Sequence, residues 1–481
     1  MSPVTILLCF IAYTVLLFFI TWLTSRRANN DSYYIGNKSS RWYIVSYGMI
    51  GASLSGVTFM SVPGLVGSSQ FTYLGIVLGF LIGYTVIATI LLPLYYRLNL
   101  TSIYAYLNQR FGFWSHKTGA FYFLLSRVIG ASFRMFLVVN VLQIFVFDHW
   151  GVPFGLVVAV FITLIILYTF EGGVKTIIWT DTLQTTFMLL GVVLSIVFIS
   201  NELGLGLGDI FHKISDAGYT RVVETDWHSK NFFLKQFFSG AFIAIVMTGL
   251  DQEMMQKNIS CRNLKEAQRN MFTFSGILVI VNILFLILGA VLYLYASSKG
   301  IDIPKKSDDI FPVIAFNYLS PLAGLVFMVG LVSAAYPSAD GALTALTTSF
   351  CVDFLGFKDK SKLDEKKKKK IRYVVHLSFA AILLIVILIF KALNNEAVIN
   401  AIYTAAGYTY GPLLGLFAFG LFTKFSVKDN YVWIVALLSP LICYLLSSYS
   451  EILFNGYKFG FELLILNGIL TFAGLFVLRK K

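Results

Sequence analysis

The segment most informative about the fold reads Gly48-Met49-Ile50-Gly51-Ala52-Ser53-Leu54-Ser55-Gly56-Val57-Thr58-Phe59-Met60-Ser61-Val62-Pro63. Glycine and proline weaken a helix at this point, and hydrocarbon cannot satisfy the carbonyls that a break would free. A break therefore requires a polar cavity, where unwound carbonyls and the hydroxyls of Ser53, Ser55 and Thr58 would suit a small hard cation. The alternative is a seam of small residues that packs two helices closely. We favour the broken helix.

About thirteen apolar segments follow one another along the 481 residues, each close to the roughly 20 residues that a helix needs to cross a bilayer. Continuous apolar runs, such as residues 192–199, exclude an outer-membrane β-barrel, whose strands alternate in polarity. The expected fold class is therefore an all-α integral membrane protein. The predicted spans are 3–24, 42–66, 72–98, 118–147, 152–170, 177–200, 234–257, 269–297, 321–352, 371–392, 398–423, 431–449 and 460–478.

Lysine and arginine gather in every second gap between these spans, whereas the gaps around 64–69, 148–151 and 394–396 contain neither residue. The positive-inside bias then predicts an N-terminus outside and a C-terminus in the cytoplasm, in the cell (inner) membrane. Loops 201–233 and 298–320 contain lysines on the outer side, but long loops follow the bias weakly. Arg26 and Arg27 directly follow the first span, which we therefore expect to be a retained anchor rather than a cleaved signal.

Composition narrows the possible functions. The net charge of +13 lies along one membrane face, where anionic lipid attracts it, so no nucleic acid partner is expected and the lysine run 366–370 is predicted to be a solvated loop. The 4 cysteines are scattered without the spacing of a disulfide frame or metal site. No phosphate-binding loop, zinc-protease motif or Ser/His/Asp grouping stands in a credible setting, which argues against an ATP-driven pump, a membrane protease or any other enzyme.

Charged residues inside the predicted spans indicate function. Asp340 falls near the middle of the ninth span, where burial of a carboxylate costs at least ~2.5 kcal/mol, so a partner or bound cation is expected. Asp181 and Asp251 lie in the inner thirds of their spans and could instead meet water or cap a helix. Arg127 and Arg134 are seven residues apart on one helix face, and either pair with acids or meet an anionic ligand.

Several motifs together resemble the sodium:solute symporter family, whose members carry sugars, proline, sialic acid, vitamins or iodide with sodium. The resemblance covers nearly the whole chain. The motifs are Ser53 to Phe59, Glu171-Gly172-Gly173-Val174-Lys175-Thr176 with Trp179-Thr180-Asp181, Asp251-Gln252-Glu253-Met254-Met255-Gln256, Ser338 to Asp353, and Tyr410-Gly411-Pro412-Leu413-Leu414-Gly415-Leu416-Phe417.

The resemblance implies a LeuT-type core of two inverted five-helix repeats, at 42–200 and 234–423. An extra helix and cytoplasmic loop at 1–41 precede this core, an extracellular loop at 201–233 separates the repeats, and two further helices at 424–481 follow. The charge pattern supports the inversion independently, because the first repeat starts inside and the second starts outside.

The resemblance also implies a sodium site made by Gly51, Leu54, Ala334 and Ser338. Pro337 departs from the family pattern, because many relatives carry a hydroxyl residue there. Asp340 stands where a small hydroxyl residue is expected near a second sodium site, within reach of Asp181. Our hypothesis is that Asp340 and Asp181 share a cation.

For the solute, the resemblance implies a cavity near Ser53, Ser55, Thr58, Tyr73, Arg127 and Tyr408. Arg127 looks like the arginine that holds the carboxylate in sialic-acid-type relatives, so a small organic anion or acidic sugar is the expected cargo. The predicted partners are Na+, this small solute and the lipid bilayer, and the predicted state is a monomer.

The chain is thus predicted to be a sodium-coupled symporter that works by alternating access. One alternative is a proton-coupled carrier with Asp340 or Asp181 as the proton site. A sensor module is disfavoured because only Arg479, Lys480 and Lys481 follow Leu478, and a channel is disfavoured because no ring-forming repeat is present.

Overall fold

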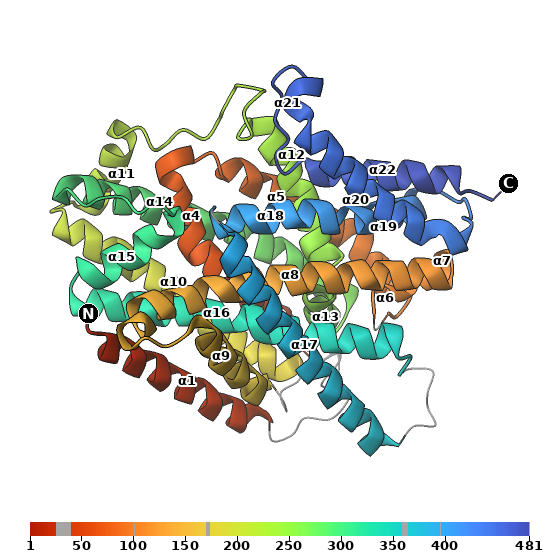
Figure 1. Cartoon of the computed structure of the whole chain (residues 1–481), viewed down its shortest axis with the longest axis horizontal. Coiled ribbons are helices and arrows are strands. Elements are labelled where there is room, and N and C mark those ends of the chain that lie inside the picture. Colours follow the sequence, from red (N-terminus) through yellow and green to blue (C-terminus); the bar gives the residue numbers. More distant parts are fainter. Residues whose placement is uncertain (26–39, 101, 170–173, 358–363, 395, 481) are drawn as a thin grey trace.

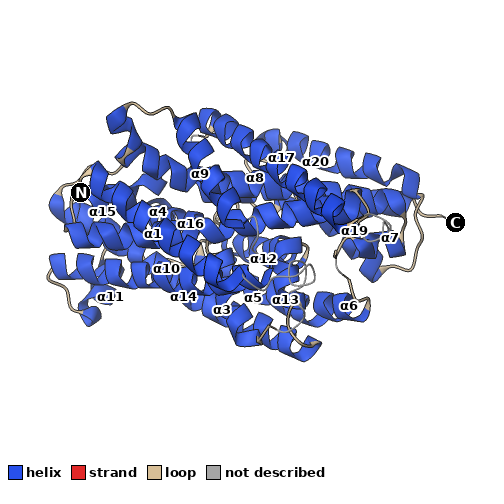
Figure 2. Cartoon of the chain, turned by 90° about the horizontal axis from the view of Figure 1, so that it is seen from below, coloured by secondary structure: helices blue, strands red, loops and turns tan. Residues whose placement is uncertain are grey.

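The computed structural model describes residues 1–25, 40–100, 102–169, 174–357, 364–394 and 396–480. Within these ranges the chain folds into helices without a β-strand, as predicted (Figure 2). Arg26, Arg27 and residues 171–173 of the predicted family motif lie outside them. The longer helices are α1 (Pro3–Ser25), α3 (Trp42–Ser53), α4 (Gly56–Ser69), α5 (Leu74–Val86), α8 (Phe113–Phe145), α9 (Phe154–Thr169), α10 (Val174–Glu202), α12 (Phe233–Ala244), α13 (Gln252–Ile259), α14 (Leu264–Lys299), α16 (Pro321–Ser349), α17 (Glu365–Leu393), α18 (Val398–Thr409), α19 (Gly411–Phe422), α20 (Val432–Ser448) and α22 (Leu463–Val477).

The described helices match the predicted spans in position. Eight helical segments are long and apolar enough to cross a membrane, and three bent helix pairs bring that number to 11. The shorter apolar helices, within α9 and at α22, lie where the two remaining spans are predicted, and their crossing of the membrane stays a prediction. The two chain ends lie at opposite ends of the molecule in both views (Figures 1 and 2), as an odd number of crossings requires.

The predicted break in the second span is confirmed. Helix α3 ends at Ser53, α4 begins at Gly56, and the two axes differ in direction by 59°. Ser55 starts the second half, because its hydroxyl accepts a hydrogen bond from the Val57 N–H at 3.3 Å as an N-cap. Pro63 lies inside α4 without ending it.

Two further spans are bent, at positions where no break is predicted from the sequence. The span of α12 and the π-helical turn η4 (Ile245–Gly249) meets α13 at 68°, and α18 meets α19 at 48°. Asp251 lies in the first of these bends and caps α13, accepting hydrogen bonds from the N–H groups of Glu253 at 3.0 Å and Met254 at 3.1 Å. Of the alternatives open for Asp251, helix capping is therefore confirmed.

Helix α16, extended by the π-helical turn η6 (Phe350–Phe354), runs through the middle of the bundle and contacts both halves of the broken span as well as α8 and α10 (Figure 1). Almost every residue from Phe327 to Ser349 is buried. A helix that carries apolar and small side chains on all its faces is typical of such a central position. Asp340 is thereby placed inside protein, where its surroundings consist of other helices rather than lipid.

Helices α5 and α12 approach so closely that their contact depends on glycine. A Cβ atom on Gly79 would lie 1.9 Å from the Phe237 carbonyl oxygen, and one on Gly240 would lie 2.1 Å from that of Ile76. Such close backbone approach is how small residues join membrane helices. The contact between α5 and α12 holds the bent seventh span against the third span. It thereby positions the bend between η4 and α13.

Three details differ from the sequence prediction. The lysine run 366–370 forms the first turns of α17 instead of a loop, because lysine is a good helix former whose charged end stays exposed here. The outer loop 201–233 contains the helix α11 (Leu207–Asp216), and the outer loop 298–320 contains η5 (Ser307–Asp309) and α15 (Ile310–Asn317). Both loops therefore contain folded segments, and their position on the outer side stays a prediction.

Candidate functional site

Two cavities lie beside the broken second span. The central cavity, of about 80 Å³, is lined by residues of α3, α4, α8, α12, η4, α14 and α18, and the outer cavity has about 340 Å³. Tyr73 and Tyr403 belong to the lining of both. Their hydroxyl oxygens lie 2.9 Å apart and share a hydrogen bond. The tyrosine pair therefore stands at the boundary between the two cavities.

Four of the six predicted solute-binding residues line the central cavity. They are Ser53, Thr58, Tyr73 and Arg127. Ser55 is buried and bonds to the Val57 N–H as the cap of α4. Tyr408 lines the outer cavity instead, so the structure places these two predicted residues away from the central one.

The two arginines of α8 differ in their surroundings. Arg127 lies 3.4 Å from the Asp251 carboxylate through Nη1 and forms an ion pair with Glu253 through Nη2. Arg134 lies two turns further along α8, lines the central cavity, and makes no hydrogen bond or ion pair with the part of the chain that the structure describes. An anion entering the cavity would thus meet the unoccupied guanidinium of Arg134, a role that the sequence analysis assigned to Arg127.

A network of buried charges joins α8, α10 and α13. The Lys257 ammonium lies 2.7 Å from Asp181 Oδ2 and 3.0 Å from Glu253 Oε1, while Glu253 also binds Arg127. All four of these side chains are at most 7% exposed. Lys257 and Glu253 are not among the site residues predicted from the sequence, because both lie near the predicted end of the seventh span, where charged residues are common. Their spacing of four residues is nevertheless that of a helical ion pair.

The break at Gly249 to Asp251 is filled by tyrosines. The Tyr95 hydroxyl donates to the Gly249 carbonyl at 2.8 Å, and the Tyr104 hydroxyl donates to the Leu250 carbonyl at 2.8 Å. The carbonyls that this bend frees are therefore satisfied by protein groups, as hydrocarbon surroundings demand. This second break offers few oxygen atoms to a ligand.

The first break, in contrast, presents oxygen atoms without such partners. The last carbonyls of a helix have no helical donor, and among the described residues only the Ile50 carbonyl regains one, from the Leu54 N–H at 2.8 Å. On α16, which packs against both α3 and α4, the buried Ser338 Oγ has no hydrogen-bond partner in the same part of the chain. Backbone carbonyls and a hydroxyl are the oxygen ligands that sodium takes at such helix breaks, so the residues present fit this ion.

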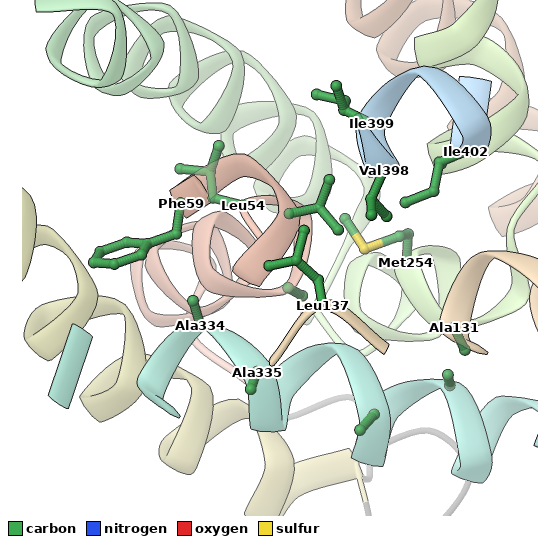
Figure 3. Packing of buried hydrophobic residues seen from close by; sticks show 14 of the residues in the cluster. Leu54, Phe59, Ala131, Leu137, Met254, Ala334, Ala335, Val398, Ile399 and Ile402 are labelled. Atoms are coloured by element: carbon green, nitrogen blue, oxygen red, sulfur yellow. The ribbon is translucent and has the colours of Figure 1, made fainter. Parts of the chain in front are cut away.

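That the predicted sodium-binding residues form one site stays a prediction. Figure 3 shows Leu54 of the break and Ala334 of α16 in one buried apolar cluster with residues of α4, α8, α13 and α18. Gly51 packs on α10, since a Cβ atom there would lie 3.3 Å from the Asp181 carbonyl oxygen. Asp340 follows Ser338 by two residues on α16 and is fully buried. Its Oδ1 atom accepts a hydrogen bond from the Gly341 N–H at 2.5 Å.

Known transporters are similar to this chain over most of its length. The sodium/sialic acid symporter SiaT of Proteus mirabilis is 25% identical over 458 residues, covering 92% of this chain and 90% of the relative. The sodium/sialic acid symporter NanT of Aliivibrio fischeri is 24% identical over 416 residues, covering 84% and 80%. The solved structure of a Na+-coupled sialic acid symporter in a substrate-bound outward-open state has a TM-score of 0.83 at 20% identity, covering 99% of this chain and 98% of that one.

These likenesses confirm the expected LeuT-type, all-helical fold class, whereas the number of membrane crossings and the boundaries of the two repeats stay predictions. The relatives are sodium-coupled, which confirms Na+ as the coupled ion and a small organic solute as its companion in a multi-pass membrane transporter. The model of the sodium:solute symporter family matches residues 33–428, most of the sequence, and the chain therefore belongs to the sodium:solute symporter family.

Proposed function

We propose that the transported solute is a small organic anion, either an acidic sugar such as sialic acid or a small carboxylate. The observation that carries this proposal is Arg134, which lines the central cavity and makes no ion pair with the described residues. A buried cation without a partner is costly inside a membrane protein, and a carboxylate would offset that cost with a two-point hydrogen bond. The relatives that carry sialic acid with sodium support the same class of solute.

The neutral polar groups of the cavity suit the rest of such a solute. Ser53, Thr58 and Asn282 line the same space as Arg134, and the Asn282 Oδ1 atom has no hydrogen-bond partner among the described residues. Hydroxyl and amide groups of this kind fix the orientation of a polar ligand. Tyr73 and Arg127 complete the wall, with Arg127 contributing positive potential although its own bonds go to Asp251 and Glu253.

The size of the cavity fits a closed state of the pathway. About 80 Å³ is well below the roughly 300 Å³ or more of an ordinary ligand pocket, whereas the outer cavity has about 340 Å³. Separation of Tyr73 from Tyr403 would join the two spaces into one that can take a sugar acid. We infer that solute enters through the outer cavity, past Tyr408, when this hydrogen bond breaks.

Sodium would bind at the break of the second span, held by the carbonyl groups of Gly51, Leu54 and Ala334 and by the Ser338 hydroxyl. An ion at this point ties α3 and α4 to α16 and so favours the conformation in which these elements are close. The support is the free Ser338 Oγ opposite the unpaired carbonyls of α3. Sodium binding would thereby preorganise Ser53 and Thr58, which flank the same break.

Electrical driving force then depends on stoichiometry. One sodium ion that moves down an inside-negative potential of about 100 mV releases ~2.3 kcal/mol, but a monoanion that accompanies it cancels that term. Accumulation would then rely on the sodium concentration gradient alone. The driving force therefore depends on the number of sodium ions that move with each solute molecule.

We further propose that the chain lies in the inner membrane as a monomer in contact with lipid, with its N-terminus outside and its C-terminus in the cytoplasm. Under this orientation the outer cavity, Lys230 and Glu396 face the exterior, and the network of Asp181, Lys257 and Glu253 lies toward the cytoplasm. That network joins α10, α13 and, through Arg127, α8. It would have to separate before solute leaves on the inner side.

The experiment is an uptake screen in proteoliposomes with sugars, sugar acids and small carboxylates, each with and without an inward sodium gradient. We expect sodium-dependent uptake of one carboxylate class, with sialic acid as the first probe, and none of neutral sugars. Uptake of a neutral sugar that keeps the same KM in the Arg134→Gln variant would contradict the proposal.

A further inference from the structure

The Lys257 ammonium occupies the place where the sequence analysis expected a second bound cation. Its nitrogen lies 2.7 Å from Asp181 Oδ2 and 3.0 Å from Glu253 Oε1, and the lysine side chain is 3% exposed. We propose that Lys257 is a built-in cation that takes the place of a second sodium ion, so that one sodium ion is bound in each transport cycle. This inference rests on the proposed sodium site at Ser338 and deepens it.

The geometry leaves Asp181 committed to the lysine. Asp181 is fully buried on α10, and Lys257 reaches it from α13 while also bonding to Glu253 one turn before it on the same helix. A sodium ion bound to the same carboxylate would stand beside the ammonium inside the protein, where like charges repel strongly because no water screens them. The carboxylate therefore already has its counter-ion.

The facing surface of α16 is also occupied. A Cβ atom on Gly341 would lie 2.1 Å from Glu253 Oε1, so the Glu253 carboxylate fills the space above this residue. A hydroxyl side chain at position 341 has no room, and Pro337 supplies no hydroxyl one turn earlier. Asp340 precedes Gly341 and is an acid on this part of α16, next to a network whose bases are Lys257 and Arg127 and whose acids are Asp181, Glu253 and Asp251.

The two candidate ion positions therefore differ in kind. At the break of the second span, Ser338 Oγ is buried and has no hydrogen-bond partner among the described residues, as expected for a ligand that awaits an ion. At Asp181, the Oδ1 atom likewise has no hydrogen-bond partner among the described residues, but Oδ2 lies 2.7 Å from the Lys257 ammonium, so a cation is already present there as part of the chain. Because it is tethered, this cation stabilises the inner contact between α10 and α13 but cannot cross the membrane and adds nothing to the driving force.

The test counts sodium ions bound to the purified full-length protein, with radioactive sodium as the probe and no solute needed. We expect one ion per chain in the wild type. In the Lys257→Met variant, which removes the charge and keeps the length of the side chain, Asp181 loses its cation while Glu253 keeps Arg127, and we expect two. Adding Asp181→Asn to Lys257→Met should return the count to one.

Lys235→Met is the matched control, because Lys235 is a buried lysine of the same bent span whose nitrogen bonds to the carbonyls of Ser229 and Lys458, far along the chain from Asp181. It should leave the count at one. Two ions in the wild type would overturn the inference, a result that needs no variant to fold. One ion in a Lys257→Met protein that still binds sodium would also overturn it. Absence of any sodium binding in the wild type would instead contradict the proposed sodium site.

Discussion

The hydroxyl oxygens of Tyr73 and Tyr403 lie 2.9 Å apart, and this hydrogen bond joins the start of the third span to α18 across the boundary of two cavities. Tyr73 is buried and directly precedes α5, while Tyr403 lies in the first half of the third bent pair. A contact made by one half of a bent helix pair is suited to a barrier that opens, because α18 can pivot about the bend that joins it to α19. The pair accordingly limits access to Arg134 from the outer cavity.

Replacement of Tyr403 by Phe should open this barrier more often. The change removes one hydrogen bond, worth about 0.5–1.5 kcal/mol, and so shifts the population toward the open form by roughly 2- to 13-fold. The measurement is the rate at which a membrane-impermeant thiol reagent modifies a cysteine placed at Ser53, in a background without the native cysteines. We expect a rate increase within that range.

Tyr408→Phe is the matched control, because Tyr408 lines the outer cavity and not the central one. It should leave the labelling rate at Ser53 unchanged. Equal rates in the Tyr403→Phe and Tyr408→Phe proteins would show that the tyrosine pair is not the barrier.

Replacement of Arg134 by Gln should weaken anion binding without loss of stability. A charge-assisted hydrogen bond to a carboxylate is worth about 1.5–3 kcal/mol, so affinity for sialic acid should fall roughly 10- to 150-fold. Arg134 makes no ion pair with the described residues, and the folded protein therefore loses no internal contact. Calorimetric titration with sialic acid and a thermal unfolding curve measure the two effects separately.

Arg127→Gln should give the opposite result. It leaves Glu253 and Asp251 without their arginine in a buried site, and breaking such a pair typically costs about 3–5 kcal/mol. A clear fall in the unfolding temperature is expected. If Arg127→Gln lost solute affinity at unchanged stability, and Arg134→Gln did not, the assignment of the two arginines would be reversed.

The break of the second span was predictable because its causes are local. Gly51, Ser55 and Gly56 weaken the helix within one turn, and the chain must then satisfy the freed carbonyls at the same point. The break before Asp251 was less predictable. Its carbonyls are satisfied by Tyr95 and Tyr104, which lie some 150 residues earlier in the chain, as separations of 154 and 146 residues show.

The division of roles between Arg127 and Arg134 also depends on tertiary structure. Both residues lie on one face of α8, and the sequence left open whether they pair with acids or meet an anionic ligand. Glu253 and Asp251 reach Arg127 only because the seventh span bends by 68° before α13. The same bend brings Lys257 to Asp181, and so no local pattern could indicate that contact.

Replacement of Ser338 by Ala should weaken sodium binding. Its hydroxyl has no other hydrogen-bond partner among the described residues, so the substitution costs the fold little but removes one proposed ligand of the ion. Loss of about 1.4 kcal/mol corresponds to a tenfold rise in the sodium concentration needed for half-maximal uptake. Ser333→Ala is the control on the same helix, because its hydroxyl already bonds to the Tyr13 hydroxyl and the Val329 carbonyl. Equal sodium affinities in the two variants would remove Ser338 from the site.

Stability should depend on pH through Asp308, which lies outside the spans in the outer turn η5. Burial raises the pKa of the Asp308 carboxyl to about 6 from 3.8, against the opposing hydrogen bond from the Val398 N–H at 2.9 Å. Because the folded-state pKa is the higher one, the stabilisation is fully present below pH 3.8 and is lost as the pH rises through about 6. Its full size is about 3 kcal/mol.

Asp308→Asn should remove this step, because an amide oxygen can still accept the hydrogen bond from Val398 and carries no charge at any pH. We expect the unfolding temperature of the wild type to fall relative to that of Asp308→Asn as the pH rises from 4 to 7, and the two curves to become parallel above that range. Asp302→Asn, an exposed acid in the same outer loop, is the control and should follow the wild type throughout. Parallel curves for the wild type and Asp308→Asn over the whole range would show that the carboxyl is not buried as described.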